Sequence, residues 1–191
     1  MKRGQTGFTL TEVLVVVTIV AILLGVGVPS YKYITNSYRL SAEMNSLVGD
    51  LMYARAEAIK EGQPVAVCVS SDGLTCSGAF SWQNGWIVFP DPNGAGAADS
   101  PPASILHVQA TFTSTDTFAA PAGANPVSSF VFNREGFAQA SNGVGFGATQ
   151  LDLQDQTQNN AWTRCMSISA QGNIQVEPAT APILTFVGVC P

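Results

Sequence analysis

Residues 8–28 read FTLTEVLVVVTIVAILLGVGV, an apolar run interrupted only by Thr9, Thr11, Glu12 and Thr18. From Val13 to Val28 it carries no charge. Its 21 residues match the length of about 20 residues that a helix needs to cross a bilayer. The sequence therefore predicts a membrane-spanning helix at the N-terminal end of the chain.

A polar leader, MKRGQTG, precedes this stretch and contains Lys2 and Arg3. Basic residues favour the cytoplasmic side of a membrane, which predicts an inward N-terminus. Lys32 and Arg39, just beyond the far end of the apolar run, weaken that asymmetry.

Glu12 stands near the start of the apolar run, where hydrocarbon makes a lone charge costly. The residue therefore needs a partner of opposite charge. The alternative for this region is an ordinary secretory signal, which is cut after its apolar run, here near Leu24–Gly27. Glu12 argues against that alternative.

The composition places limits on function. The chain has 191 residues, of which 46% are hydrophobic and 11% charged, with a formal net charge of −5. This length suits one modest domain beside an apolar segment. The negative charge gives no general attraction to nucleic acid or to an anionic membrane surface.

Beyond the apolar run, the spacing changes to one apolar stripe at intervals of three and four residues. The stripe consists of Leu40, Met44, Leu47, Val48, Leu51, Ala54 and Ala58. The helix is therefore expected to continue to about Glu61, with Gly62 and Pro64 ending it, and the stripe to pack on a sheet.

From Pro64 onward the sequence consists of short β-like runs separated by Gly, Pro, Asn and Asp. The predicted runs are Val65–Ser70, Trp86–Phe89, Ile105–Ala110, Ser128–Asn133, Gln150–Gln154, Arg164–Ala170 and Asn173–Val176. The predicted fold class is α+β, with a long N-terminal helix packed on an antiparallel sheet or sandwich.

Four cysteines lie beyond the apolar run without CxxC spacing, so two disulfides are favoured over a metal site or reduced thiols. Four residues allow three pairings. We favour Cys68–Cys76, which closes a turn containing Asp72-Gly73, and Cys165–Cys190, which ties the terminal segment to a late strand. Each contributes about 2–4 kcal/mol on the loop-entropy account.

The sequence indicates no enzyme and no cofactor, because no nucleophile elbow, HExxH or phosphate loop is present. His107, the one histidine, is expected at a surface or interface. Asp91-Pro92-Asn93-Gly94 begins like a calcium loop, but the twelfth position is Pro102 rather than Glu, so a turn is predicted.

The segment Gly7-Phe8-Thr9-Leu10-Thr11-Glu12-Val13 resembles the leader signal of type IV pilins and of type II secretion pseudopilins. The resemblance implies that a prepilin peptidase cuts between Gly7 and Phe8 and methylates Phe8. Loss of Lys2 and Arg3 takes the formal charge from −5 to −7. It also implies that Glu12 neutralises the N-terminal ammonium of a neighbouring subunit in a filament.

Pro29 matches a position at which helices of that family bend or melt, and proline does remove a helical N–H. It is therefore expected to break or loosen the helix, or to mark the membrane exit. The resulting division is a leader at 1–7, a transmembrane and assembly helix at 8–29, an amphipathic continuation at 30–62, and a β-rich extracytoplasmic domain at 63–191.

The later segments are similar to the GspH/FimT branch, which includes FimU-like minor pilins. The resemblance rests on residues 53–59 (YARAEAI), 132–136 (FNREG) and 164–174 (RCMSISAQGNI). It implies a minor pilin that primes type IV pili and sits at or near the filament tip, with other minor pilins, the major pilin and an inner-membrane assembly platform as partners. The alternative is a minor pseudopilin of a type II secretion system.

The implied location is the bacterial inner membrane, as a single span with a cytoplasmic N-terminus and a periplasmic domain, and then the pilus at the cell surface. Some relatives capture DNA through a GRxR motif. Here the matching residues are Gly172-Asn173-Ile174-Gln175, without either arginine. Nucleic-acid binding is therefore not expected.

Overall fold

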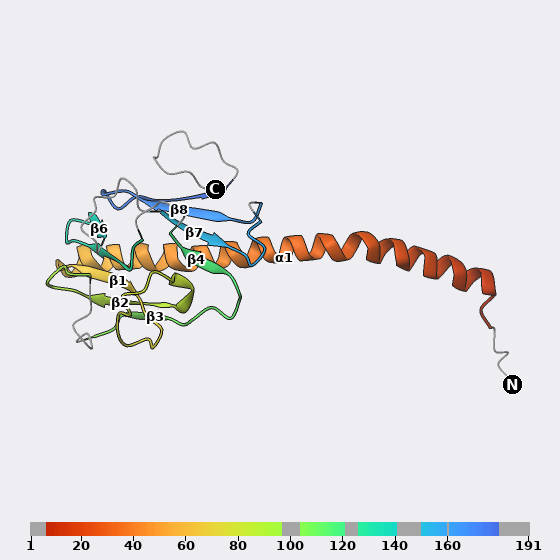
Figure 1. The fold of residues 1–191 in the computed structure, drawn as a ribbon, viewed down its shortest axis with the longest axis horizontal. Coiled ribbons are helices and arrows are strands. Elements are labelled where there is room, and N and C mark those ends of the chain that lie inside the picture. Colours follow the sequence, from red (N-terminus) through yellow and green to blue (C-terminus); the bar gives the residue numbers. More distant parts are fainter. Residues whose placement is uncertain (1–6, 97–103, 121–125, 141–149, 160, 180–191) are drawn as a thin grey trace. The chain divides into compact units, whose positions relative to one another are not determined.

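The structure is a computed structural model that describes residues 7–96, 104–120, 126–140, 150–159 and 161–179 (Figure 1). The chain divides into two compact units, Met1–Tyr38 and Arg39–Pro191.

Helix α1 spans Leu10–Glu61, 52 residues, so the predicted end at Glu61 is confirmed. Gly62 follows with a φ of 66°, a left-handed conformation that glycine adopts without strain and that commonly ends helices. Residue 29 lies inside α1, so the structure holds no break at Pro29. The predicted loosening at that position remains a prediction about the assembled state.

The strands form two antiparallel sheets, as the sequence predicts. One sheet has the order β3-β2-β1-β5-β6, with strands His107–Gln109, Trp86–Pro90, Val65–Val69, Ser129–Phe132 and Ala138–Ala140. The other has the order β4-β7-β8-β9, with strands Thr117–Ala119, Gln150–Gln154, Arg164–Ile168 and Ile174–Pro178. A short 3-10 helix, η1, spans Trp82–Asn84.

The core lies between the second half of α1 and both sheets (Figure 1). Six of the seven predicted stripe residues are at most 1% exposed, and Val48 packs against the core from a partly buried position. Phe130 and Phe132 on β5 and Leu151 and Leu153 on β7 meet the stripe from the two sheets. The predicted packing of this helix face on a sheet is confirmed.

A second, smaller cluster covers the opposite face of the β1-β2-β5 sheet. Because side chains alternate along a strand, Val67 on β1 packs in the main core and Cys68 packs in the smaller cluster. A disulfide joins Cys68 to Cys76, with 5.6 Å between the two Cα atoms, so this predicted pairing is confirmed. The bond holds the loop after β1 against the sheet.

Arg55 on α1 binds the turn between β8 and β9, and this turn contacts the turn after β5 in the other sheet. Its guanidinium donates hydrogen bonds to the carbonyl oxygens of Gly172, at 3.0 Å, and Gln171, at 2.9 Å. Gly136 and Gly172 both have positive φ, and a Cβ at Gly172 would stand 2.5 Å from the carbonyl oxygen of Gly136. Only glycine fits this contact between the turn after β5 and the turn after β8.

Candidate functional site

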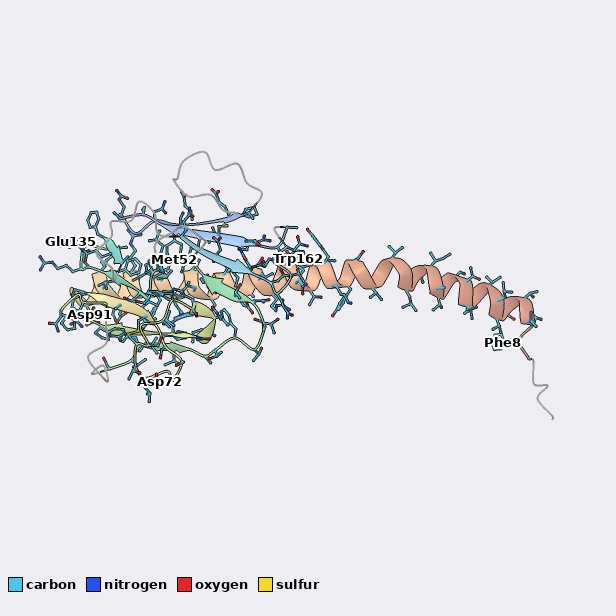
Figure 2. All side chains as sticks on the ribbon, viewed as in Figure 1. Phe8, Met52, Asp72, Asp91, Glu135 and Trp162 are labelled. Carbon is cyan, nitrogen blue, oxygen red and sulfur yellow. A yellow bond between two sulfur atoms is a disulfide. The ribbon has the colours of Figure 1, made fainter. Side chains whose placement is uncertain are left out.

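The predicted processing site lies just outside the helix. Gly7 and Phe8 precede α1, and the Phe8 side chain is 81% exposed (Figure 2). Among the residues that the structure describes, no atom lies within 4 Å of a Cβ placed on Gly7. The described part of the fold therefore does not require glycine at position 7.

Thr9 caps the N-terminal end of α1. Its hydroxyl oxygen accepts a hydrogen bond from the backbone N–H of Glu12, at 3.3 Å. A threonine followed three residues later by a glutamate is the sequence pattern of a capping box. The sequence reasoning missed this role, although the T-x-x-E pattern carries the signal. The cap fixes the start of the helix immediately after the Gly7-Phe8 junction.

Glu12 lies in the first turn of α1, where the helix dipole favours a negative charge. Its side chain forms no ion pair with the residues that the structure describes. The partner predicted for this carboxylate is therefore not within the described part of the chain.

The first half of α1 presents apolar side chains on all sides (Figure 2). Its large apolar residues are all exposed, from Val20 at 46% to Leu10 at 81%. An apolar surface of this extent marks contact with a membrane or with other protein. Among the described residues, α1 is the one helix long and apolar enough to cross a membrane, by length and composition.

The Thr18 hydroxyl lies within this apolar surface and donates a hydrogen bond to the carbonyl oxygen of Leu14 in the preceding turn, at 2.8 Å. Such a bond removes an unpaired polar group from an apolar surface, as hydrocarbon surroundings require. In the sequence from Leu10 to Val28, Glu12 is the one charged residue.

In the second unit, an ion pair joins α1 to the segment before β4. The Arg39 guanidinium donates to both carboxylate oxygens of Asp116, at 2.8 and 2.9 Å, and the Asp116 side chain is fully buried. The Ser114 hydroxyl donates to the Glu43 carboxylate at 2.8 Å. Burial, with Asp116 nearby, raises the pKa of Glu43. Sequence reasoning missed this cluster because 77 positions separate Arg39 from Asp116.

The basic side chains of the second unit are engaged in internal contacts. Arg39 pairs with Asp116, Arg55 binds turn carbonyls, Lys60 pairs with Glu57 and Glu61, Arg134 pairs with Glu135, and Arg164 donates to the carbonyls of Trp162 and Thr163. Each of these five charges therefore lies against a carboxylate or a carbonyl oxygen of the described chain.

Asp91 forms the predicted turn. The backbone N–H of Gly94 donates to the Asp91 carbonyl oxygen at 2.9 Å, and that of Gly96 donates to the Asp91 carboxylate at 2.7 Å. The carboxylate is thus used as a local cap. Within the described ranges, no three His, Cys, Asp or Glu side chains lie together as metal ligands.

His107 lies on β3 with a half-exposed side chain, and its Nδ1 is 3.1 Å from a carboxylate oxygen of Asp50. The other oxygen of Asp50 accepts a hydrogen bond from the indole N–H of Trp86, at 2.7 Å. His107 therefore contributes to a surface contact between β3 and α1.

The second predicted disulfide, Cys165–Cys190, lies partly outside the described residues. Cys165 is on β8, and Cys190 falls in the segment 180–191, which the structure does not describe. This pairing remains a prediction.

Comparison with known proteins finds two family matches. The family described as type II transport protein GspH matches residues 43–172. A prokaryotic N-terminal methylation motif matches residues 2–28. The three segments at 53–59, 132–136 and 164–174 all overlap the first match, and they include Arg55, Gly136 and Gly172, which meet in space.

Similar proteins include the type IV major fimbrial protein FimA of Dichelobacter nodosus, which is 39% identical over 79 residues. The match covers 41% of this chain and 46% of that protein, so it extends over less than half of the relative.

Two crystal structures of the type IV minor pilin FimU of Pseudomonas aeruginosa have a similar fold. One has a TM-score of 0.57 at 21% identity and covers 78% of this chain and 97% of that one. The other has a TM-score of 0.52 at 22% identity, with 75% and 97% covered. The predicted fold class, a long N-terminal helix packed on antiparallel strands, is confirmed.

Proposed function

The chain belongs to the GspH family of pilin-like proteins, which are structural proteins and not enzymes, and on that premise we propose that it is a minor pilin that helps to prime and build type IV pili. It sits at or near the filament tip. The observation that carries this proposal is the arrangement around the Gly7-Phe8 junction. The junction lies outside a helix that Thr9 caps, and the first turn of that helix contains Glu12. The large apolar side chains of the following turns are all exposed.

Processing is the first step of this function. The methylation motif over residues 2–28 implies cleavage by a prepilin peptidase. A Cβ at Gly7 meets no atom of the described residues, which supports a role of the glycine in the peptidase, where an unhindered extended backbone is needed. Cleavage there exposes the amino group of Phe8, which the peptidase methylates.

Assembly then depends on Glu12. A carboxylate in an apolar filament core is costly unless it is paired. The new N-terminal ammonium of a neighbouring subunit supplies the opposite charge. Since this pair can form at one axial offset, it selects the register in which subunits stack.

Before assembly, the first half of α1 holds the subunit in the inner membrane, with the N-terminus in the cytoplasm and the β-rich domain in the periplasm. Its partners are the inner-membrane assembly platform, other minor pilins and the major pilin. The likeness to a type IV fimbrial protein supports the pilus as the destination.

The second candidate is a minor pseudopilin of a type II secretion system, supported by the description of the matching family. Both candidates share the leader, the anchor and the fold. Deletion of the gene separates them: loss of surface pili with normal protein secretion indicates the pilus, and the reverse indicates the secretion system.

Mass spectrometry of the mature N-terminus tests the processing step. We expect a chain that begins at Phe8 and carries a methyl group on its amino nitrogen. An intact Met1, or a cut near Gly27, would overturn the proposal.

Substitution of Glu12 tests the assembly step. Glu12→Gln keeps the size and removes the charge, and we expect the subunit to be processed and folded but absent from sheared filaments. Glu61→Gln, at the other end of the same helix, is the matched control and should be incorporated normally. Equal incorporation of the two variants would contradict the pairing.

DNA capture is tested by a gel-shift titration at low salt. Since the basic side chains of the second unit are held in internal contacts, we expect no retardation at concentrations where a pilin with a basic patch binds. Tight binding would make DNA capture the better description of the function.

A further inference from the structure

Tyrosine is concentrated immediately beyond the apolar half of α1. Three of the four tyrosines of the chain are Tyr31, Tyr33 and Tyr38, and residues 9–30 contain no aromatic residue. The Tyr31 and Tyr33 side chains are 72% and 52% exposed, with Lys32 between them. We propose that Tyr31, Lys32 and Tyr33, here called the collar, bind the outer headgroup layer of the bilayer and set the depth of the subunit. This inference rests on the proposed membrane-anchored function.

The length of the apolar run places the collar at the right height. At 1.5 Å per residue, residues 10–28 rise about 28 Å, close to the roughly 30 Å of a hydrocarbon core. The collar follows about 5–8 Å beyond Val28, and the headgroup layer on each side of a bilayer is about 5–8 Å thick. Lys32 is the first charged residue after Glu12.

The direction of helical side chains brings the rings closer to the lipid. Each Cα–Cβ bond in a helix tilts toward the N-terminus, so the Tyr31 and Tyr33 rings lean back over the preceding turn. Two residues apart on a helix, they point to nearly opposite sides. The rings therefore flank the helix on both sides at the level where it leaves the hydrocarbon.

The chemistry of the collar fits lipid headgroups. Tyrosine has an apolar ring and a polar hydroxyl, and it concentrates at membrane–water interfaces for that reason. Lys32 forms no ion pair with the residues that the structure describes, so its ammonium is available to lipid phosphates. The rest of the mature chain has a strong negative charge, which does not favour a phosphate surface.

Processing increases the importance of the collar. Cleavage after Gly7 removes Lys2 and Arg3, the basic residues on the inner side of the span. After that step, the collar is the cluster of interface-seeking side chains that flanks the span, and it holds the subunit at one height until extraction into a filament.

Tyr38 provides a matched control within the same helix. It lies seven residues after Tyr31, on the same side of α1, and is similarly exposed at 74%. It stands about 15 Å beyond Val28 and so above the headgroup layer. A lipid-binding collar therefore includes Tyr31 and excludes Tyr38.

Depth-dependent fluorescence quenching tests this proposal on the full-length chain. The chain is reconstituted in vesicles of phosphatidylethanolamine and phosphatidylglycerol whose acyl chains carry bromine near the headgroup or near the bilayer centre. We expect Tyr31→Trp and Tyr33→Trp to be quenched more by shallow than by deep bromine. Tyr38→Trp should show no quenching above that of the native tryptophans.

Ile22→Trp, in the middle of the apolar run, reports on the span itself and should be quenched most by deep bromine. If Ile22→Trp is not quenched, the proposed membrane span is overturned, and so is the proposed collar. If it is quenched while Tyr31→Trp and Tyr33→Trp are not, the span stands and the collar is overturned. Quenching of Tyr38→Trp equal to that of Tyr31→Trp also overturns the selective depth.

The depth-setting role has its own test. With Ile22→Trp as the reporter, the double substitution Tyr31→Ala/Tyr33→Ala should shift the ratio of shallow to deep quenching, and Tyr38→Ala should leave the ratio unchanged. An unchanged ratio in the double variant overturns this role. Crosslinking of the collar to a neighbouring subunit in filaments, without shallow quenching in vesicles, would assign these tyrosines to protein contacts instead.

Discussion

Residues 10–28 and residues 40–58 belong to the same helix, and both are rich in apolar side chains. In the first region the large apolar side chains are all exposed; in the second, Leu40, Leu47 and Leu51 are fully buried. The first is apolar on every side, whereas the second confines its apolar residues to one stripe. The second region thus finds its burial within the chain, and the first requires lipid or another subunit to provide it.

The largest expected effect comes from truncating one apolar residue in each region. Leu51→Ala should lower the free energy of unfolding by about 2–5 kcal/mol, because it leaves a cavity in the core. Val17→Ala, at a residue that is 61% exposed, should change it by less than about 0.5 kcal/mol.

Urea unfolding of the full chain in detergent, followed by the fluorescence of the buried Trp82 and Trp86, measures both values. Similar losses of free energy of unfolding in the two variants would mean that residues 10–28 also support the fold of the domain. The two regions would then not differ in where they find their burial.

The Cys68–Cys76 disulfide also stabilises the domain without a partner, and a second disulfide, Cys165–Cys190, is predicted. Replacing both Cys165 and Cys190 with alanine should cost roughly 3–4 kcal/mol, more than the same change at Cys68 and Cys76, because the larger loop restricts the unfolded chain more. Peptide mapping without reduction should join Cys165 to Cys190. A peptide in which Cys165 is joined to another cysteine would contradict the predicted pairing.

The regular elements were predictable from periodicity. The stripe from Leu40 to Ala58 predicted the helix, Gly62 and Pro64 predicted its end near Glu61, and the alternation in Val65–Val69 predicted β1. The short strands β4 and β6 were missed, because three residues such as Thr117–Ala119 carry too little pattern. They form because β7 and β5 offer them a partner.

The contacts between distant segments were not predictable. Nothing near Arg39 in the sequence points to Asp116, and Arg55 meets Gly172 only after both sheets have formed. The candidate processing site was readable because its residues are consecutive. The capping role of Thr9 also follows from a local pattern, T-x-x-E, although the sequence analysis did not predict it.

Arg39 sharpens the boundary between the two regions, since it is the first residue of the second unit. Arg39→Ala leaves the buried Asp116 carboxylate without its two hydrogen bonds and should cost about 2–3 kcal/mol. The control is Lys60→Ala, whose side chain is 66% exposed and whose loss should leave the free energy of unfolding nearly unchanged. Equal losses in urea unfolding would show that the Arg39 pair adds nothing beyond a surface contact.

One buried carboxylate in the domain lowers the stability of the folded state. Asp152 on β7 is 3% exposed, and neither carboxylate oxygen has a hydrogen-bond partner within the described ranges. Burial raises the pKa of Asp152 to about 6 from 3.8. The folded state therefore disfavours the ionised form, so this group destabilises the domain fully above pH 6, and the cost falls away as the pH drops toward 4.

Asp152→Asn removes the charge and should raise the free energy of unfolding by roughly 1–3 kcal/mol at pH 7. The gain should shrink on acidification and be nearly absent at pH 4, where Asp152 is neutral in the folded state and half protonated in the unfolded one. Paired urea titrations of the two proteins at pH 7 and pH 4 measure this difference. A gain in the free energy of unfolding that is independent of pH would mean that the Asp152 carboxylate is solvated or paired. The core of the domain would then contain no uncompensated charge at this position.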